Sequence, residues 1–118
     1  MRDHTKLRAF EVADELTLLI YRRTARFPRE EQFGLTSQMR RAAVSIGSNI
    51  VEGCARETHA DYLRFLDMAY ASARELQYQI SIARRLEYLT SEHAKELEDA
   101  ATECTKVLNG LIRALRSP

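Results

Sequence analysis

The feature that most constrains this chain is a helical hydrophobic pattern that runs almost from end to end. Apolar residues recur every three or four positions in four stretches. Each of the three interruptions contains residues that end or cap helices, among them Pro28, Gly53 and Thr90. The pattern therefore predicts four helices, at about residues 7–26, 36–53, 59–88 and 91–115.

Short connections between consecutive helices favour antiparallel neighbours, so we predict an all-α, antiparallel up-down-up-down four-helix bundle. The 118 residues fit one domain, residues 1–118, which can bury a core without disulfides or metals. In the third stretch the apolar positions keep a strict alternation of four and three, as in left-handed bundles. Cys54 and Cys104 lie fifty residues apart, and we expect two buried free thiols.

Four local features lead to further expectations. Thr36 or Ser37 is suited to cap the second helix, as Thr58 is for the third. Phe33 is expected to be an apolar plug beneath the linker after Pro28, and that linker is expected to contain a helical turn of its own. Gly110 lies inside the fourth helical pattern, which suggests a close helix approach or a frayed last turn.

The charges nearly cancel overall but are unevenly distributed. Eighteen Lys and Arg oppose seventeen Asp and Glu, and fifteen of the eighteen cations are Arg. Residues 22–41 hold six Arg against two Glu, a net of +4, whereas residues 92–103 hold five acids against one Lys, a net of −4. The basic segment is a candidate nucleic-acid interface. The alternative is that these Arg are solvated or paired with the acidic helix of a neighbouring subunit. The candidate residues are Arg22, Arg23, Arg26, Arg29, Arg40 and Arg41.

The second helix carries more than its core face. A polar stripe and a second, smaller apolar face lie outside the core positions, which predicts a partner helix from another subunit. In the alternative interpretation Val44 and Val51 are ordinary exposed aliphatic residues. The polar set could also form a reactive centre if Arg41 and Glu75 share a buried cleft. The candidate interface and polar network comprises Gln38, Arg41, Val44, Ser45, Gly47, Asn49, Val51, Glu52, Ser72 and Glu75.

The sequence shows no motif for catalysis, metal binding or membrane insertion. His4, His59 and His93 are far apart, no Cys-His or Ser-His pairing is visible, and Gly residues are too few for a phosphate-binding loop. We therefore predict no catalytic residue, no metal, no cofactor and no enzymatic activity. The charged start leads into no apolar leader, which predicts a cytoplasmic protein with no membrane partner.

The middle third of the chain resembles a known family. After Phe27-Pro28 and Glu31, residues 33–46 read FGLTSQMRRAAVSI and residues 48–53 read SNIVEG. This run resembles the signature of the four-helix proteins encoded in intervening sequences of bacterial 23S ribosomal RNA genes, often called the S23 family. Departures are mild: Val12 and Cys54 stand where relatives often have an aromatic and a small residue.

The resemblance implies a four-helix bundle that assembles into a ring-shaped homopentamer. It also implies similarity to the accessory protein of diversity-generating retroelements, which associates with a reverse transcriptase and nucleic acid. The resemblance supplies no catalytic residues. We therefore expect self-association and binding of ribosomal RNA or another structured nucleic acid. The alternative is a protein-interaction scaffold, for example a partner of a reverse transcriptase, with no specific nucleic-acid role.

Overall fold

The computed structural model describes residues 2–117, and in this range every regular element is helical, as predicted. The four long helices lie within a few residues of the predicted ranges. Two short 3₁₀ helices precede α1 and α2. In chain order the elements are η1 (His4–Lys6), α1 (Arg8–Thr24), η2 (Arg29–Glu31), α2 (Leu35–Cys54), α3 (His59–Arg85) and α4 (Ser91–Arg116).

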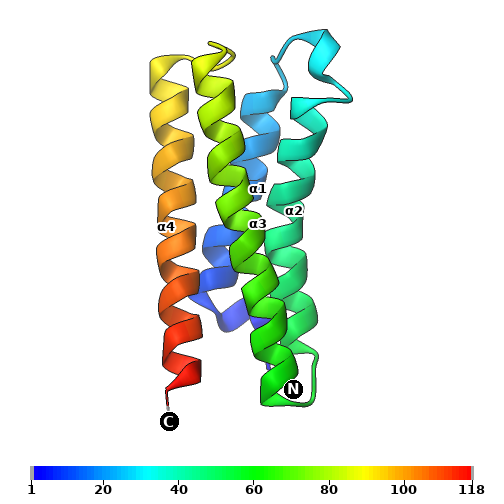
Figure 1. The fold of residues 1–118 in the computed structure, drawn as a ribbon, viewed down its shortest axis with the longest axis vertical. Helices are drawn as coiled ribbons and strands as arrows, with labels where there is room; N and C mark the ends of the chain where they lie inside the picture. Colours follow the sequence, from blue (N-terminus) through cyan, green and yellow to red (C-terminus); the bar gives the residue numbers. More distant parts are fainter. Residues whose placement is uncertain (1, 118) are drawn as a thin grey trace.

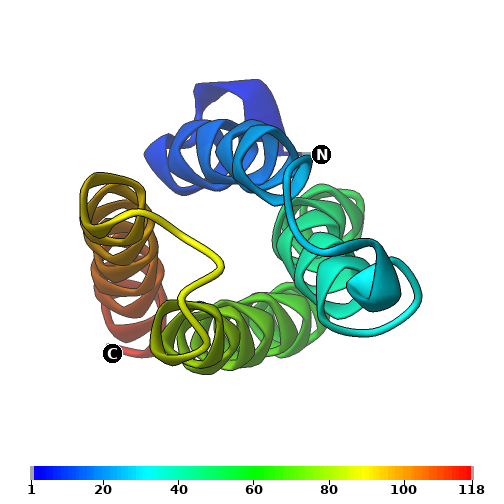
Figure 2. The same cartoon turned by 90° about the horizontal axis from the view of Figure 1, so that it is seen from above.

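The helices run alternately up and down, and each packs against its neighbours in sequence, with α4 closing the bundle against α1 (Figures 1 and 2). The predicted four-helix bundle is therefore confirmed. The start of η1 and the end of α4 lie at one end of the bundle, here called the termini end, together with the α2–α3 connection. The opposite end, here called the linker end, holds the α1–α2 linker and the α3–α4 connection.

The core follows the apolar pattern most closely in α3. All seven predicted positions are buried, namely Tyr62, Leu66, Ala69, Ala73, Leu76, Ile80 and Ala83. In α4 the core continues from Leu108 to Ile112, while Leu111 and Leu115, which the pattern placed in the core, are only half-buried. Cys54 and Cys104 are buried and free, as expected, and burial raises the pKa of Cys104 to about 12.

Two of the predicted helix caps are confirmed and one is wrong. Thr58 and Thr90 accept hydrogen bonds from backbone N–H groups in the first turns of α3 and α4. In contrast, α2 begins one residue before Thr36, with Gly34 at the cap position. The linker turn η2 brings the Glu31 carboxylate back to this helix start, where Oε1 accepts from Leu35 N at 3.0 Å. A carboxylate from the linker thus replaces the hydroxyl cap.

Two other local expectations are wrong. The Phe33 side chain is 91% exposed and plugs nothing. Phe27 is the buried aromatic at this point, with its ring centroid 5.4 Å from that of Tyr88. A Cβ on Gly110 would meet no atom within 4 Å, and α4 continues six residues beyond it, so neither a close approach nor an early fray explains this glycine.

Among residues 2–117, none of the helices combines the length and the hydrophobicity that crossing a membrane requires.

Candidate functional site

The six candidate Arg of residues 22–41 all lie towards the linker end of the bundle. Arg22 and Arg23 are in the last turn of α1, and Arg40 and Arg41 follow the first turn of α2. The linker itself extends outward beyond the helix ends (Figure 1). The structure therefore places the basic segment at one end of the bundle, as the sequence predicted, with Arg22, Arg23 and Arg26 on the α1–α4 side and Arg41 on the α2–α3 side.

Two of these six guanidinium groups are already engaged within the chain. Arg23 donates from Nε to Glu96 at 2.7 Å and from Nη2 to the same carboxylate at 3.2 Å. This pair lowers the pKa of Glu96 and raises that of Arg23. Arg40 donates to Thr24 Oγ1 at 2.9 Å, and its guanidinium lies 4.7 Å from the centre of the Tyr21 ring. Both contacts hold α1 to its neighbours.

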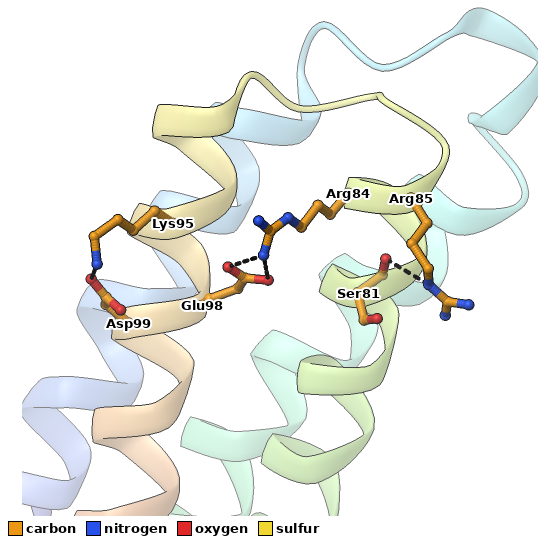
Figure 3. Close-up of polar contacts among 6 residues, drawn as sticks. All are labelled: Ser81, Arg84, Arg85, Lys95, Glu98 and Asp99. Atoms are coloured by element: carbon orange, nitrogen blue, oxygen red, sulfur yellow. Dashed lines mark hydrogen bonds and ion pairs between the residues drawn. The ribbon is translucent and has the colours of Figure 1, made fainter.

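The acidic segment 92–103 does not form a separate pole of the molecule. Four of its five acidic side chains form ion pairs with cations of the same chain. Figure 3 shows two of these pairs, Arg84 with Glu98 and Lys95 with Asp99, at 2.9 and 3.0 Å. The other two pairs are Arg23 with Glu96 and Arg8 with Glu103. The negative charge of α4 is therefore largely compensated by cations of the same chain.

Four candidate Arg keep their charge available. Within residues 2–117, no carboxylate oxygen lies within 4.0 Å of the guanidinium nitrogens of the following residues: Arg22, Arg26, Arg29 and Arg41. Arg22, Arg23 and Arg26 line a surface hollow of about 410 Å³, whose opposite wall is Tyr88 and the first turn of α4 with His93. Guanidinium groups around such a hollow are suited to phosphate oxygens.

The linker that carries Arg29 is fixed by one carboxylate. Glu31 accepts from Leu35 N at 3.0 Å and from the Tyr88 hydroxyl at 2.8 Å, so it joins the linker to α2 and to the α3–α4 connection. These two hydrogen bonds lower the pKa of Glu31, because they favour its charged form. This role leaves no signal in the sequence, because Tyr88 lies fifty-seven residues further along the chain.

The predicted interface set divides into two surfaces on either side of α2. Towards α1, a groove of about 430 Å³ is lined by Val44, Gly47 and Val51 together with Phe10 of α1. Val44 is 43% exposed and Val51 is 36% exposed, so both valines remain accessible in the single chain. Asp14, Ser48 and Glu52 form the polar part of this groove. This surface is the apolar face that the sequence indicated.

Towards α3, most polar members of the set, though not Glu52 or Asn49, line a different groove of about 310 Å³. The Ser45 and Ser72 hydroxyls lie 2.9 Å apart, and Asn49 Nδ2 donates to Ser45 O at 2.9 Å. Arg41 and Glu75 line the same groove, but both side chains are exposed and they form no ion pair with each other. The groove is thus open to solvent, unlike the buried cleft that a reactive centre would need. Gln38 completes the wall on α2.

Gln79 also lines this groove and was not identified from the sequence. The residue is only 4% exposed, and its Oε1 has no hydrogen-bond partner within the described part of the chain. It lies among the apolar core positions of α3, beside Ile80. The presence of one polar residue there does not indicate that its side chain lines a groove.

The three histidines remain apart in the structure. His59 lies at the start of α3 with a ring nitrogen 2.9 Å from Leu115 O, and the His4 ring packs edge-on against Phe10. Within residues 2–117, His, Cys, Asp and Glu side chains form no group of three or more that could hold a metal ion.

Comparisons with known proteins find a matching family model and a similar solved structure. A family model described as 23S rRNA-intervening sequence protein matches residues 5–110. A crystal structure from Bacteroides thetaiotaomicron, described as a protein with unknown function from the S23 ribosomal protein family, superposes with a TM-score of 0.80. The two chains are 27% identical, and the match covers 89% of this chain and 98% of the other. None of the curated proteins compared with the chain matches it.

Proposed function

Since this chain belongs to the 23S rRNA-intervening sequence protein family, we propose that it is a non-enzymatic, homo-oligomeric protein that binds RNA or DNA through the linker end. One observation carries the proposal: among residues 2–117, Arg22, Arg26, Arg29 and Arg41 have no carboxylate partner, while four of the five acids of α4 are paired. The linker end therefore keeps unpaired positive charge, although the whole chain has a net charge of only +1.

Phosphate contacts at this end are expected to be individually weak. Each Arg that neutralises a phosphate releases condensed counterions, and binding therefore weakens as salt rises. A ring of subunits multiplies the effect, because several linker ends on one face engage the same nucleic acid at once. Weak contacts repeated in this way give useful affinity without base-specific contacts.

The test is salt-titrated binding to a labelled RNA hairpin. The native protein should bind at low salt, and a variant with Arg22, Arg26 and Arg29 all replaced by Ala should lose at least tenfold in affinity. Its logarithmic salt slope should fall by about 2, because about 0.7 to 0.9 of the slope comes from each phosphate contact. Arg23 is left intact because its pair with Glu96 is structural. Absence of native binding at low salt, or an unchanged affinity in the variant, contradicts the proposal.

We further propose that the grooves beside α2 mediate assembly into a ring, with five subunits as the expected number. A cyclic ring needs two different surfaces on each subunit, and α2 separates an apolar groove from a polar one. Light scattering should give about five times the 13.6 kDa mass of one chain. Val44→Asp combined with Val51→Asp should produce monomers. A native monomer at micromolar concentration contradicts this part of the proposal.

The alternative function is a scaffold that binds a protein, such as a reverse transcriptase, and contacts nucleic acid only incidentally. The α2 grooves would then receive that partner. The salt titration separates the two functions, since a protein scaffold gives no RNA binding that depends on the linker-end Arg.

A further inference from the structure

Phe33 is the most exposed large apolar side chain of the described residues. It is 91% exposed, whereas the next most exposed, Tyr78 of α3, is 63% exposed and carries a hydroxyl that water can solvate. A phenylalanine in water gives up the stabilisation that burial would provide. Its position on the surface therefore needs a reason outside the packing of this chain.

Hydrogen bonds anchor the linker backbone next to Phe33. Gly34 N donates to Glu31 O at 3.0 Å, and the Glu31 carboxylate is itself bonded to α2 and to Tyr88. A Cβ on Gly34 would lie 2.6 Å from Glu31 Oε1, so the glycine makes room for the carboxylate that fixes the turn. The backbone around Phe33 is thus anchored, so a ligand that contacts its ring does not have to order the linker backbone.

The surroundings of Phe33 indicate what kind of ligand fits. Arg29 lies four residues before it, and neither Arg29 nor Arg26 has a carboxylate partner within residues 2–117. The carboxylate of Glu31 is turned back to Leu35 and Tyr88. Glu30 is exposed, but residues 22–41 remain net positive because six Arg outnumber the two Glu. An exposed aromatic ring in the same short linker region as unpaired Arg residues matches a ligand with flat aromatic faces and negative charges at short spacing.

We propose that Phe33 stacks on an unpaired nucleobase, while Arg26 and Arg29 contact the phosphates next to that base. This inference rests on the proposed function and defines its ligand as single-stranded or looped nucleic acid. A continuous duplex hides the faces of its bases, whereas unpaired bases stack readily on aromatic side chains. Stacking tolerates any base, so the preference is for unpaired structure and not for sequence.

A tryptophan at position 33 tests the contact directly, because the native chain contains no Trp. In Phe33→Trp the indole is the only tryptophan, and stacking on a base should quench its fluorescence. We expect quenching by a single-stranded 12-nucleotide RNA and much less by the same sequence in a duplex. Tyr78→Trp places the reporter at another exposed aromatic site and should show no comparable quenching. Equal quenching by duplex and single strand overturns the inference.

Affinity measurements with the same single strand complete the test. Phe33→Ala should weaken binding by roughly tenfold, the range found when one stacking aromatic is removed, and Phe33→Leu should weaken it nearly as much. Wild-type affinity in Phe33→Leu, or a change of oligomeric mass in Phe33→Ala, would assign Phe33 to an apolar protein contact and overturn the inference. If the Arg variant loses binding while Phe33→Ala keeps it, only this inference fails. If the native protein binds no RNA, the proposed function fails first.

Discussion

The two ends of the bundle use the same residue types in opposite ways. At the termini end, the guanidinium of Arg2 lies 4.0 Å from the centre of the Tyr62 ring, and those of Arg56 and Arg64 lie 4.6 and 4.7 Å from the centre of the Phe65 ring. Both rings are buried. At the linker end, Phe33 is exposed and three nearby Arg have no carboxylate partner in residues 2–117.

The difference distinguishes side chains that stabilise the fold from side chains that are accessible to a ligand. At the termini end the backbone comes close enough that a Cβ on Gly53 would lie 2.9 Å from Phe65 Cβ, and the cations cover what remains of the rings. Arg and aromatic side chains at the termini end therefore interact with one another through cation–π contacts within the chain. At the linker end, Arg40 over Tyr21 is a similar pair, but in the described part of the chain Arg22, Arg26, Arg29 and Phe33 have no such partners. Side chains that the fold does not use are those available to a ligand.

The largest effect that this comparison predicts is on stability. Phe65→Ala should lower the free energy of unfolding by about 3–5 kcal/mol, because it removes a buried ring from a tightly packed site. Phe33→Ala should change it by no more than about 0.5 kcal/mol, because the ring contacts little within the chain. Urea denaturation of both variants at one protein concentration measures the difference. Equal losses would show that the two ends do not differ as described.

A smaller effect concerns pH. The pKa of Glu31 is lowered in the folded chain, so this carboxylate contributes stability above its unfolded pKa, near pH 4.5, and loses that contribution as pH falls through the folded value. Glu31→Gln should therefore be less stable than the native protein at pH 7, and the gap should narrow as pH falls below about 4.5. Urea denaturation between pH 7 and 3 follows the gap. A gap that stays constant with pH would exclude a role for the carboxylate charge at the linker end.

Most of the fold could be predicted from local pattern. The core face of α3 and the caps Thr58 and Thr90 depend on spacing within one helix, and all are observed. The failures depend on contacts between distant segments. Phe33 and Phe27 are both apolar residues beside a proline turn, and only the packing of Tyr88 determines which one is buried.

The same limit applies to the candidate site. The charge count located the basic segment, because six Arg lie within twenty residues. It could not identify Arg23 as a structural residue, since its partner Glu96 is seventy-three positions away. Likewise, the polar stripe of α2 was visible in the sequence, but its division between two grooves depends on where α1 and α3 pack.

The most direct test of the central claim compares matched Arg variants at the two ends. One variant replaces Arg22, Arg26 and Arg29 by Ala at the linker end, and the other replaces Arg56, Arg64 and Arg113, which lie towards the termini end. Both lower the net charge by three, so the change in total charge is matched. Because the control also loses the Arg56 and Arg64 contacts with the Phe65 ring, urea denaturation checks that both variants stay folded. RNA affinity at low salt should fall at least tenfold in the linker-end variant and much less in the control. Equal losses, or a larger loss in the control, would contradict the account.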